Sequence, residues 1–431
     1  MAQKDSGRLT HANIPIIQES EYYNIQGMFE KIQEIVMYYG FIPVHLPMIE
    51  HEEFVAKAAG KQPEKITETL YGVKQPKSGD KLSLLQTTAP GFIRTYIDEN
   101  MIALPQPVMM YRFGPRYQNQ KNGTHESFTF DLEVVGSEKS IMDALLIRLA
   151  VLSIEELGGK HIFVHINSLG DKTCRQHYIK ELSNYYRKHI NSLDKDDRQL
   201  LKTDPLLVLN SEKEGTKEVN ANVPDPLSFL TTECKKQFKE VLEYLDELGI
   251  SYRIDKKITH ELDSDSHTMF EIRGYSEDEE GNHDEVNSVI LARGGRHDNL
   301  IKMLGSKKDI PAVGASIYVQ SIMSMPWFKP HSPRNLKEPK VYFIQLGTEA
   351  KMKSLAVLEH LRKAKIPVMK ALSKDSLQAQ LSVAEKIGVP YTIIFGHKEA
   401  LEGTVIIRAM KNRSQKTVKI DKMIEELKKI K

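Results

Sequence analysis

The sequence predicts an α+β protein with antiparallel strands, a helical insertion between sheet elements and a separate α/β domain at its C-terminal end. Residues 108–118 and 128–135 are rich in aromatic and β-branched residues and flank a polar stretch. That pattern is typical of two antiparallel strands joined by a mobile loop. Residues 171–249 have helical periodicity around a middle rich in lysine and aspartate. Beyond residue 338, short apolar runs alternate with helical patterns, which indicates βαβ units.

The individual elements follow from periodicity and from breaks in it. A long amphipathic helix is predicted at residues 23–39, with Gly40 as its C-terminal cap. Helices are also predicted at both ends of the insertion, at 174–189 and 234–248. A proline-punctuated connector at 327–333 cannot continue a helix and marks the best domain boundary. The strands and helices predicted after it are 341–346, 350–363, 368–370, 377–387, 391–395, 405–408 and 420–430.

Composition limits the classes of function. Hydrophobic residues make up 40% and charged residues 27% of the 431 residues, which is enough apolar material for packed cores. The net charge of +2 means that any nucleic-acid surface must be a local patch. Two cysteines, Cys174 and Cys234, cannot supply a disulfide framework or a four-ligand zinc site. We therefore expect a reducing compartment, the cytoplasm, and no structural metal. Neither a signal peptide nor a membrane-spanning stretch is expected.

Several stretches resemble histidyl-tRNA synthetases over almost the entire chain, and their order and spacing carry the resemblance. They include Gly40-Phe41, Asn167-Ser168-Leu169-Gly170, Asp204-Pro205-Leu206, Gly294-Gly295-Arg296 and Ser376-Leu377. The resemblance implies a class II synthetase domain at residues 1–325, an antiparallel sheet flanked by helices with its insertion at about 171–249. It further implies a linker at 326–337, an anticodon-binding-like α/β domain at 338–431, and a homodimer formed through the first helix and the following strand.

The chemistry of this family needs fixed positive charge, because a carboxylate attacks the α-phosphate of ATP and both groups are anions. In the family an arginine follows Gly-Pro-x-[Phe/Tyr], but here Gln118 follows Gly114-Pro115-Arg116-Tyr117. A second arginine ends the third class motif, where this chain has Ser321. The arginine of a histidine-specific segment is replaced by His260, and the glutamate that holds the substrate ammonium by Gln86. These replacements indicate a pseudoenzyme.

Other residues of the site are retained or available as substitutes. Arg116 has the same parity as Gln118 in a regular strand, so a shift of one pleat would bring its charge towards the phosphate. Glu133, Asp263 and Arg296 stand at positions that line the substrate pocket in the family. For Arg296, a strand-end turn with a solvated side chain is an equal alternative. No residues at metal-ligand spacing are recognised, so no metal site is expected.

The C-terminal domain carries the candidate RNA-binding residues. A basic, polar cluster around Arg408, Arg413 and Gln415 is suited to phosphates and unpaired anticodon bases, and the alternative is a solvated edge strand. With Ser376 and Glu399, these residues resemble the anticodon-domain pattern of the family. The loop that reads the acceptor end lacks the family's Arg-Pro-Gln-x-Gly-Arg, so charging of the acceptor stem is unsupported.

The leading hypothesis is a catalytically degenerate paralogue that binds tRNA as a homodimer and acts as a regulator or sensor, with a protein partner still to be identified. No cofactor is expected. Regulatory subunits of ATP phosphoribosyltransferase, which resemble the synthetase fold and bind histidine without charging tRNA, provide a precedent. One alternative is a divergent but active histidine–tRNA ligase, which would need ATP and Mg²⁺. Another is a ligase for a different acid or nucleotide.

Overall fold

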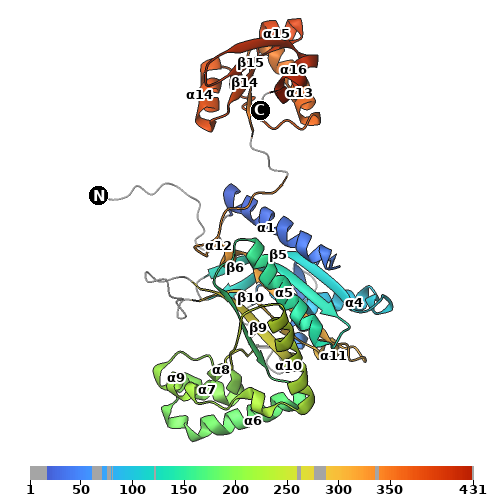
Figure 1. The fold of residues 1–431 in the computed structure, drawn as a ribbon, viewed down its shortest axis with the longest axis vertical. Helices are drawn as coiled ribbons and strands as arrows, with labels where there is room; N and C mark the ends of the chain where they lie inside the picture. The colour runs from blue at the N-terminus through green and yellow to red at the C-terminus, as the bar shows by residue number, and fades with distance from the viewer. Residues whose placement is uncertain are drawn as a thin grey trace, which may run out of the picture. The chain divides into compact units, whose positions relative to one another are not determined.

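The computed structural model describes residues 17–60, 70–74, 79, 81–120, 123–259, 264–275, 288–334 and 339–429. The chain divides into two compact units, residues 1–333 and 334–431. Both units mix helices with sheets (Figure 1). None of the helices in the described ranges is long and apolar enough to cross a lipid bilayer.

The first unit is built on a large sheet, which confirms the predicted antiparallel architecture. Within the described residues it has eight strands in the order β1-β5-β6-β11-β10-β9-β7-β8. Neighbours from β5 to β7 pair antiparallel, whereas the outer pairs β1–β5 and β7–β8 are parallel. The strands are β1 (Ile42–Pro43), β5 (Val108–Gln120), β6 (Gly123–Val135), β7 (Ile162–Ser168), β8 (Tyr252–Ile254), β9 (Ser266–Gly274), β10 (Val289–Arg296) and β11 (Ala312–Tyr318).

Two long helices, α1 (Glu19–Tyr38) and α5 (Ser140–Glu156), pack against one face of this sheet (Figure 1). Their apolar residues form a continuous core with alternate residues of the strands, such as Phe130, Leu132 and Val134 of β6. Because successive strand residues point to opposite faces, the residues between them lie on the other face. This alternation positions the polar side chains of the candidate site.

The hairpin of β5 and β6 is longer than predicted. Its pairing continues without a break from Val108 opposite Val135 to Gln120 opposite Gly123. The prediction of a loop at residues 119–127 was therefore wrong for 119–120 and 123–127, which belong to strands. Polar residues are accommodated because main-chain hydrogen bonds to the opposite strand hold the ladder whatever the side chains are.

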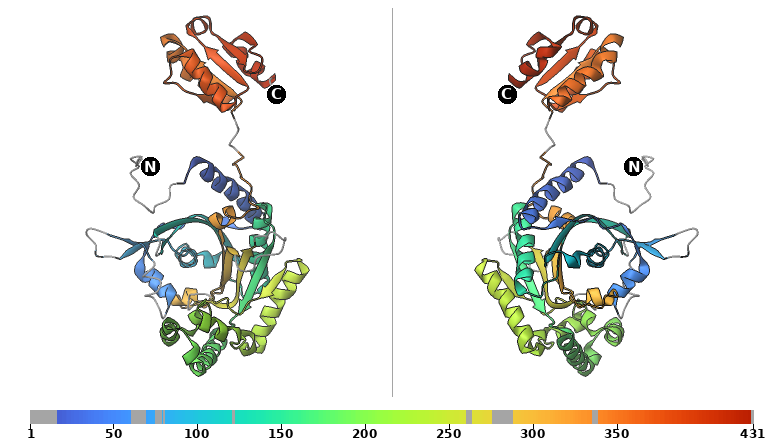
Figure 2. Two further views of the ribbon diagram at one scale, coloured as in Figure 1. Left: turned by 90° about the vertical axis from the view of Figure 1, so that its left-hand side faces the viewer. Right: turned by 90° about the vertical axis from the view of Figure 1, so that its right-hand side faces the viewer.

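The helical insertion lies between β7 and β8, as predicted, and has its own core around Tyr178, Leu182 and Tyr186. Figure 2 shows its green helices at the end of this unit away from α1. Asp194 and Asp204 cap two of these helices by accepting main-chain N–H groups. The elements are α6 (Lys172–Lys188), η2 (Ile190–Ser192), α7 (Lys195–Thr203), α8 (Pro205–Val208), α9 (Glu214–Ala221), η3 (Pro226–Phe229) and α10 (Thr232–Glu247).

Smaller elements cover part of the second face of the large sheet. Phe92, Ile93 and Tyr96 of the helix α4 pack there against Val108 and Met110 of β5. A small sheet of order β2-β4-β3 accompanies them in the described chain. These elements are β2 (Ile49–His51), α2 (Glu52–Ala59), β3 (Gly72–Val73), β4 (Leu82–Leu84), α4 (Ala89–Asp98), η1 (Met101–Ala103) and α11 (Leu300–Met303). The short helix α12 (Val319–Met323) packs instead into the core shared with α1 and α5.

The second unit has a five-stranded sheet, counted over its described residues, in the order β13-β12-β14-β15-β16. The strands β13, β12 and β14 are parallel, which confirms the predicted βαβ pattern, and β15 and β16 extend the sheet antiparallel. The elements are β12 (Val341–Gln345), α13 (Thr348–Lys363), β13 (Val368–Lys370), α14 (Leu377–Ile387), β14 (Tyr391–Phe395), α15 (His397–Glu402), β15 (Thr404–Ala409), β16 (Gln415–Lys419) and α16 (Ile420–Lys429).

Candidate functional site

The candidate site lies on the face of the large sheet opposite α1 and α5. Arg112 of β5 donates from Nη1 to Asp131 Oδ2 of β6 at 3.1 Å, and the two side chains are 4% and 1% exposed. Thr129 donates its hydroxyl to the same carboxylate oxygen at 2.8 Å. The charge of Arg112 is thus matched inside the sheet.

Arg116 reaches across the same face from the next pleat of β5. Its Nη1 lies 3.3 Å from Ser316 Oγ of β11 and 3.9 Å from Asp131 Oδ1, and the guanidinium lies over the ring of Tyr318. The side chain of Arg116 is 19% exposed to solvent. The strand register therefore places Arg116 on the predicted face, where a serine, a carboxylate and an aromatic ring hold its charge near the surface. Its role in catalysis stays a prediction.

Two of the replaced positions lie beside this end of β5. Gln118 follows Arg116 by two residues and is exposed. The main-chain N–H of Tyr117 donates to the carbonyl of Leu85 at 2.9 Å. That bond places Gln86, the next residue along the chain, close to the end of β5. Both positions carry a neutral amide side chain, and their assignment as replaced catalytic positions stays a prediction.

The third replaced position, Ser321, lies half-buried in the short helix α12. The neighbouring Gln320 accepts the main-chain N–H of Phe128 at 2.8 Å, which ties this helix to β6 of the same hairpin. The structure thus brings Ser321 to the same end of the sheet as the first two positions. The remaining replaced position, His260, and the retained Asp263 lie outside the described residues.

The carboxylate of Glu133 is occupied by a side chain of the same protein. His297 Nε2 lies 2.6 Å from Glu133 Oε1, and the two side chains are 8% and 2% exposed. Burial raises the pKa of Glu133, and the charge of His297 offsets part of that rise. Burial alone lowers the pKa of His297, but Glu133, Asp265 and Asp298 together raise it above its usual range. The result is an imidazole–carboxylate pair enclosed by the fold.

Arg296 lies on the other side of the sheet, towards α5. Its fully buried guanidinium donates to the carboxylate of Asp143 in α5, to the carbonyl of Ser137 and to Asp298 Oδ2 at 3.2 Å. The alternative of a solvated arginine was therefore wrong. A buried pair of this kind ties the sheet to the helix, because removing one partner leaves an uncompensated charge. The assignment of Arg296 to a substrate pocket stays a prediction.

Sequence reasoning missed Asp131, His297, Ser316 and Tyr318. The alternation of polar and apolar residues along β6 was a sufficient signal for Asp131, because it shares the parity of Glu133. No local signal places Ser316 and Tyr318 on this face, since they come from β11, with Arg116 and Ser316 200 positions apart in the chain.

The candidate RNA-binding residues of the second unit fall into two groups. Ser376 Oγ accepts the N–H of Ala379 at the start of α14. Glu399 Oε2 accepts the N–H of Gly396 at 3.1 Å at the start of α15. Both residues therefore cap helices that begin at the C-terminal ends of the parallel strands.

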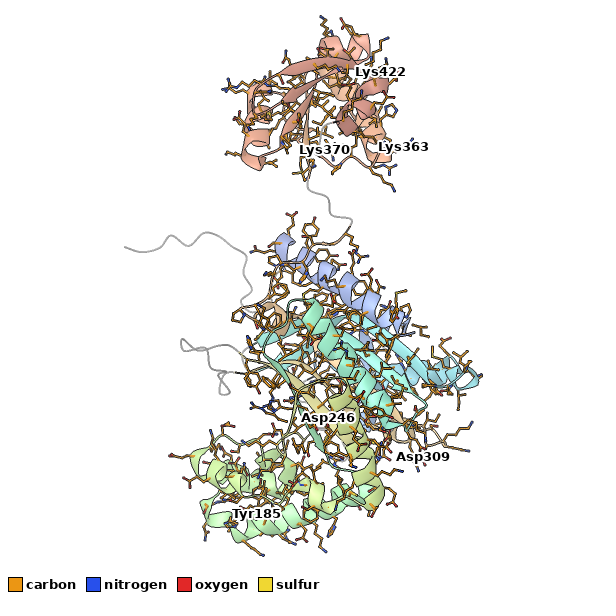
Figure 3. All side chains as sticks on the ribbon, in the orientation of Figure 1. Tyr185, Asp246, Asp309, Lys363, Lys370 and Lys422 are labelled. Atoms are coloured by element: carbon orange, nitrogen blue, oxygen red, sulfur yellow. The ribbon has the colours of Figure 1, made fainter. Side chains whose placement is uncertain are left out.

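The other group lies at the opposite end of that sheet. Arg408 pairs with Gln415 across β15 and β16, and Arg413 lies in the turn between these strands with φ 57°. The pairing of Arg408 with Thr392 places this group beside the start of β14. Because β16 is an edge strand, the alternative of an edge strand was correct for the backbone, and RNA contact stays a prediction. Lysines project around this unit, and Figure 3 labels Lys363, Lys370 and Lys422.

Known proteins resemble this chain both in fold and in sequence. The fold is similar to that of histidyl-tRNA synthetase from S. aureus, with a TM-score of 0.76 and 21% identity, covering 99% of this chain and 100% of that chain. An antiparallel sheet flanked by helices and followed by this α/β unit is the fold of class II aminoacyl-tRNA synthetases.

The sequence profiles are more specific than the fold. Residues 16–322 match the family described as "Histidyl-tRNA synthetase", and residues 340–430 match "Anticodon binding domain". The chain is 29% identical over 412 residues to the histidine–tRNA ligase of Caldicellulosiruptor saccharolyticus, covering 95% of this chain and 96% of that one. It is 30% identical over 416 residues to that of Thermodesulfovibrio yellowstonii, covering 95% of each. The chain belongs to the histidyl-tRNA synthetase family.

Proposed function

We propose that this chain is a tRNA-binding member of its family that does not activate histidine and that acts as a regulatory paralogue. The buried pair of Glu133 and His297 carries the proposal. A free histidine would offer an imidazole and an ammonium group, both of which suit a carboxylate. At the retained pocket position Glu133 already holds the chain's own imidazole at 2.6 Å. A histidine ligand would have to displace a buried, hydrogen-bonded side chain.

The distribution of positive charge supports the same proposal. Each preorganised donor lost from such a site costs roughly 10²- to 10³-fold in rate. Neutral side chains stand at Gln86, Gln118 and Ser321, and Arg112 is paired with Asp131 at 3.1 Å. This face therefore offers fewer fixed positive charges to offset the repulsion between the two reacting anions.

A divergent active ligase remains the second candidate, and Arg116 is the observation that favours it. Its guanidinium reaches Ser316 on the central strand β11 and keeps 19% exposure. A phosphate placed against this side chain would receive a fixed positive charge. In this alternative ATP and Mg²⁺ bind at this face, and activity disappears when Arg116 is removed.

Binding of tRNA is supported by the second unit, which matches the anticodon binding domain over residues 340–430. Arg408, Arg413 and Gln415 gather at one end of its sheet. Phosphate contacts there would make affinity fall with salt. Acceptor-stem contacts are less supported, because the sequence between the two strands lacks the Arg-Pro-Gln-x-Gly-Arg pattern that the resemblance leads one to expect there.

A homodimer through α1 and β1 is part of the proposal. Met37, Tyr38 and Tyr39 at the end of α1 are 55%, 86% and 37% exposed, and Ile42 of the edge strand β1 is 42% exposed. Contiguous exposed apolar side chains of this kind mark protein–protein contacts. The proposed partner is the same surface on a second copy of the chain.

A direct test of the proposal asks whether free histidine can displace the imidazole of His297 from Glu133. Histidine is titrated by calorimetry into the intact chain and into His297→Ala, in which the Glu133 carboxylate loses its partner. We expect no binding to the intact chain at millimolar histidine. Free imidazole or histidine should raise the melting temperature of His297→Ala by occupying the cavity.

His331→Ala is the matched control, because His331 is a partly buried histidine that bonds the carbonyl of Leu157 instead of a carboxylate. Its melting temperature should not respond to imidazole. Tight histidine binding by the intact chain would contradict the proposal and favour the active ligase.

A further inference from the structure

The two cysteines of the chain lie against each other although they are 60 residues apart, with Cys174 Sγ 3.9 Å from Cys234 Sγ. Both are buried. A buried residue touches ~6–12 others, so two cysteines placed independently in a chain of 431 residues would meet about 2 times in 100. Their contact therefore calls for a physical account beyond chance packing.

Both cysteines lie in the first turn of a helix, and their sulfur atoms lie next to each other. Cys174 is in the first turn of α6, where Asp171 Oδ1 accepts its N–H at 2.8 Å. Cys234 is in the first turn of α10, where Thr231 Oγ1 accepts its N–H at 3.3 Å. The N–H of Thr231 also points at Cys174 Sγ, at 3.3 Å. Two helices thus present a cysteine at the same position after the cap.

A third donor completes the arrangement. A carboxylate oxygen of Asp171 and the two Sγ atoms lie within 4.8 Å of one another. Tetrahedral Zn²⁺ binds thiolates at ~2.3 Å, which separates two of them by about 3.8 Å. The observed 3.9 Å matches this edge, whereas a disulfide would need the sulfur atoms at ~2.05 Å. Asp171 is half-buried, and a water molecule would be the fourth ligand.

We propose that Cys174, Cys234 and Asp171 form a binding site for one thiophilic divalent cation, with Zn²⁺ as the expected ion. Binding replaces the two thiol protons, which are released to solvent, and joins both sulfur atoms and the carboxylate to the cation. The site cross-links the start of α6 to the start of α10, the first and last long helices of the insertion. The proposal differs from the expectation, drawn from the cysteine count, that no structural metal is present.

The ionisation of the groups is compatible with such a site. Burial raises the pKa of the Cys174 thiol, so this thiol stays protonated at neutral pH until a cation displaces the proton. Partial burial alone raises the pKa of Asp171, but the N–H groups of Cys174 and Thr173 outweigh it and lower the pKa below its usual range. The carboxylate is therefore charged and ready to bind.

The test uses the metal-free, reduced full-length chain, checked by circular dichroism, and titrates it with Co²⁺ and then Cd²⁺. Thiolate complexes of these ions absorb in the visible and ultraviolet. We expect the absorbance to saturate at one equivalent per chain, with two protons released and full displacement by Zn²⁺. Cys174→Ser or Cys234→Ser leaves one thiolate and should lower the sulfur charge-transfer band by at least half, and the double variant Cys174→Ser/Cys234→Ser should remove it.

Asp171→Asn isolates the third donor and should weaken metal binding by ~10-fold or more, as loss of a ligand or its support does. Asp225→Asn is the matched control, because Asp225 caps η3 in the same insertion by accepting the N–H of Leu227 at 3.0 Å. It should bind as the unchanged chain does. The proposal is overturned if the folded, reduced chain shows no saturable absorbance, or if the intact mass of the isolated chain is lower by two hydrogens, which identifies a disulfide.

Discussion

Glu133 and His297 couple the fold to proton uptake, because the pKa of each is raised above its usual value. At a pH between the unfolded and folded pKa of a group, the native chain binds more protons than the unfolded chain. For His297, stability is fully present below its unfolded pKa of ~6.5 and is lost as the pH rises through its higher folded pKa. The raised pKa of Glu133 acts in the same direction at lower pH.

We therefore expect the free energy of unfolding to fall as the pH rises above ~6.5, by at most ~1.4 kcal/mol per pH unit from this histidine. Urea unfolding between pH 6 and pH 9 measures this slope. The double variant Glu133→Gln/His297→Gln removes both titrating groups and should lose that part of the slope. An identical pH dependence in both chains would show that the pair does not titrate as described.

At the scale of elements, local periodicity was sufficient to predict α1, α6, α10 and the alternation of strands and helices in the second unit, because those patterns depend on nearby residues. The length of the β5–β6 hairpin depends on pairing with the opposite strand, which composition does not report. Arg296 shares the parity of Ala292 in β10, and its pairing with Val313 of β11 keeps it on the face towards α5, which the family resemblance does not report. The meeting of Cys174 and Cys234 depends on two helices far apart in sequence.

The two groups of candidate RNA-binding residues in the second unit should have different effects when they are substituted. One should change the stability of the unit and the other its affinity for tRNA. Ser376→Ala removes the cap of α14 and should lower the stability of this unit by ~1 kcal/mol, with little change in tRNA affinity. Arg408→Ala/Arg413→Ala should lower tRNA affinity at least several-fold and flatten its salt dependence, without a comparable loss of stability. Filter binding at several salt concentrations and thermal unfolding of the same samples measure both effects.

Lys363→Ala is the control for charge, because Lys363 is exposed at the end of α13, away from the β15–β16 turn in sequence. If Lys363→Ala weakens tRNA binding as much as the arginine pair does, the surface is not localised at that turn.

At the scale of the whole molecule, the chain combines a sheet unit in which Arg112 is paired with Asp131 and Glu133 with His297, and an α/β unit that matches an anticodon binding domain. The apolar end of α1 and the edge strand β1 together leave main-chain and apolar groups at the surface. Such a surface is consistent with the proposed dimer, in which a second copy would cover it.

Tyr38→Glu should therefore weaken self-association by placing a charge at the most exposed apolar residue of this surface, 86% exposed. Sedimentation equilibrium should show a dimer for the unchanged chain and a monomer at the same concentration for the variant. Met352→Glu is a matched control, because Met352 is 70% exposed on α13 of the other unit. A monomeric unchanged chain would contradict the proposed dimer.

Histidine-dependent exchange of pyrophosphate into ATP tests the central claim most directly, because it reports formation of histidyl-adenylate without tRNA. The same assay on an active family member sets the reference rate. We predict no exchange above the background measured without histidine, in a preparation that still shifts tRNA in a gel. Exchange at a synthetase-like rate that disappears in Arg116→Ala would contradict the account and identify an active ligase that uses Arg116.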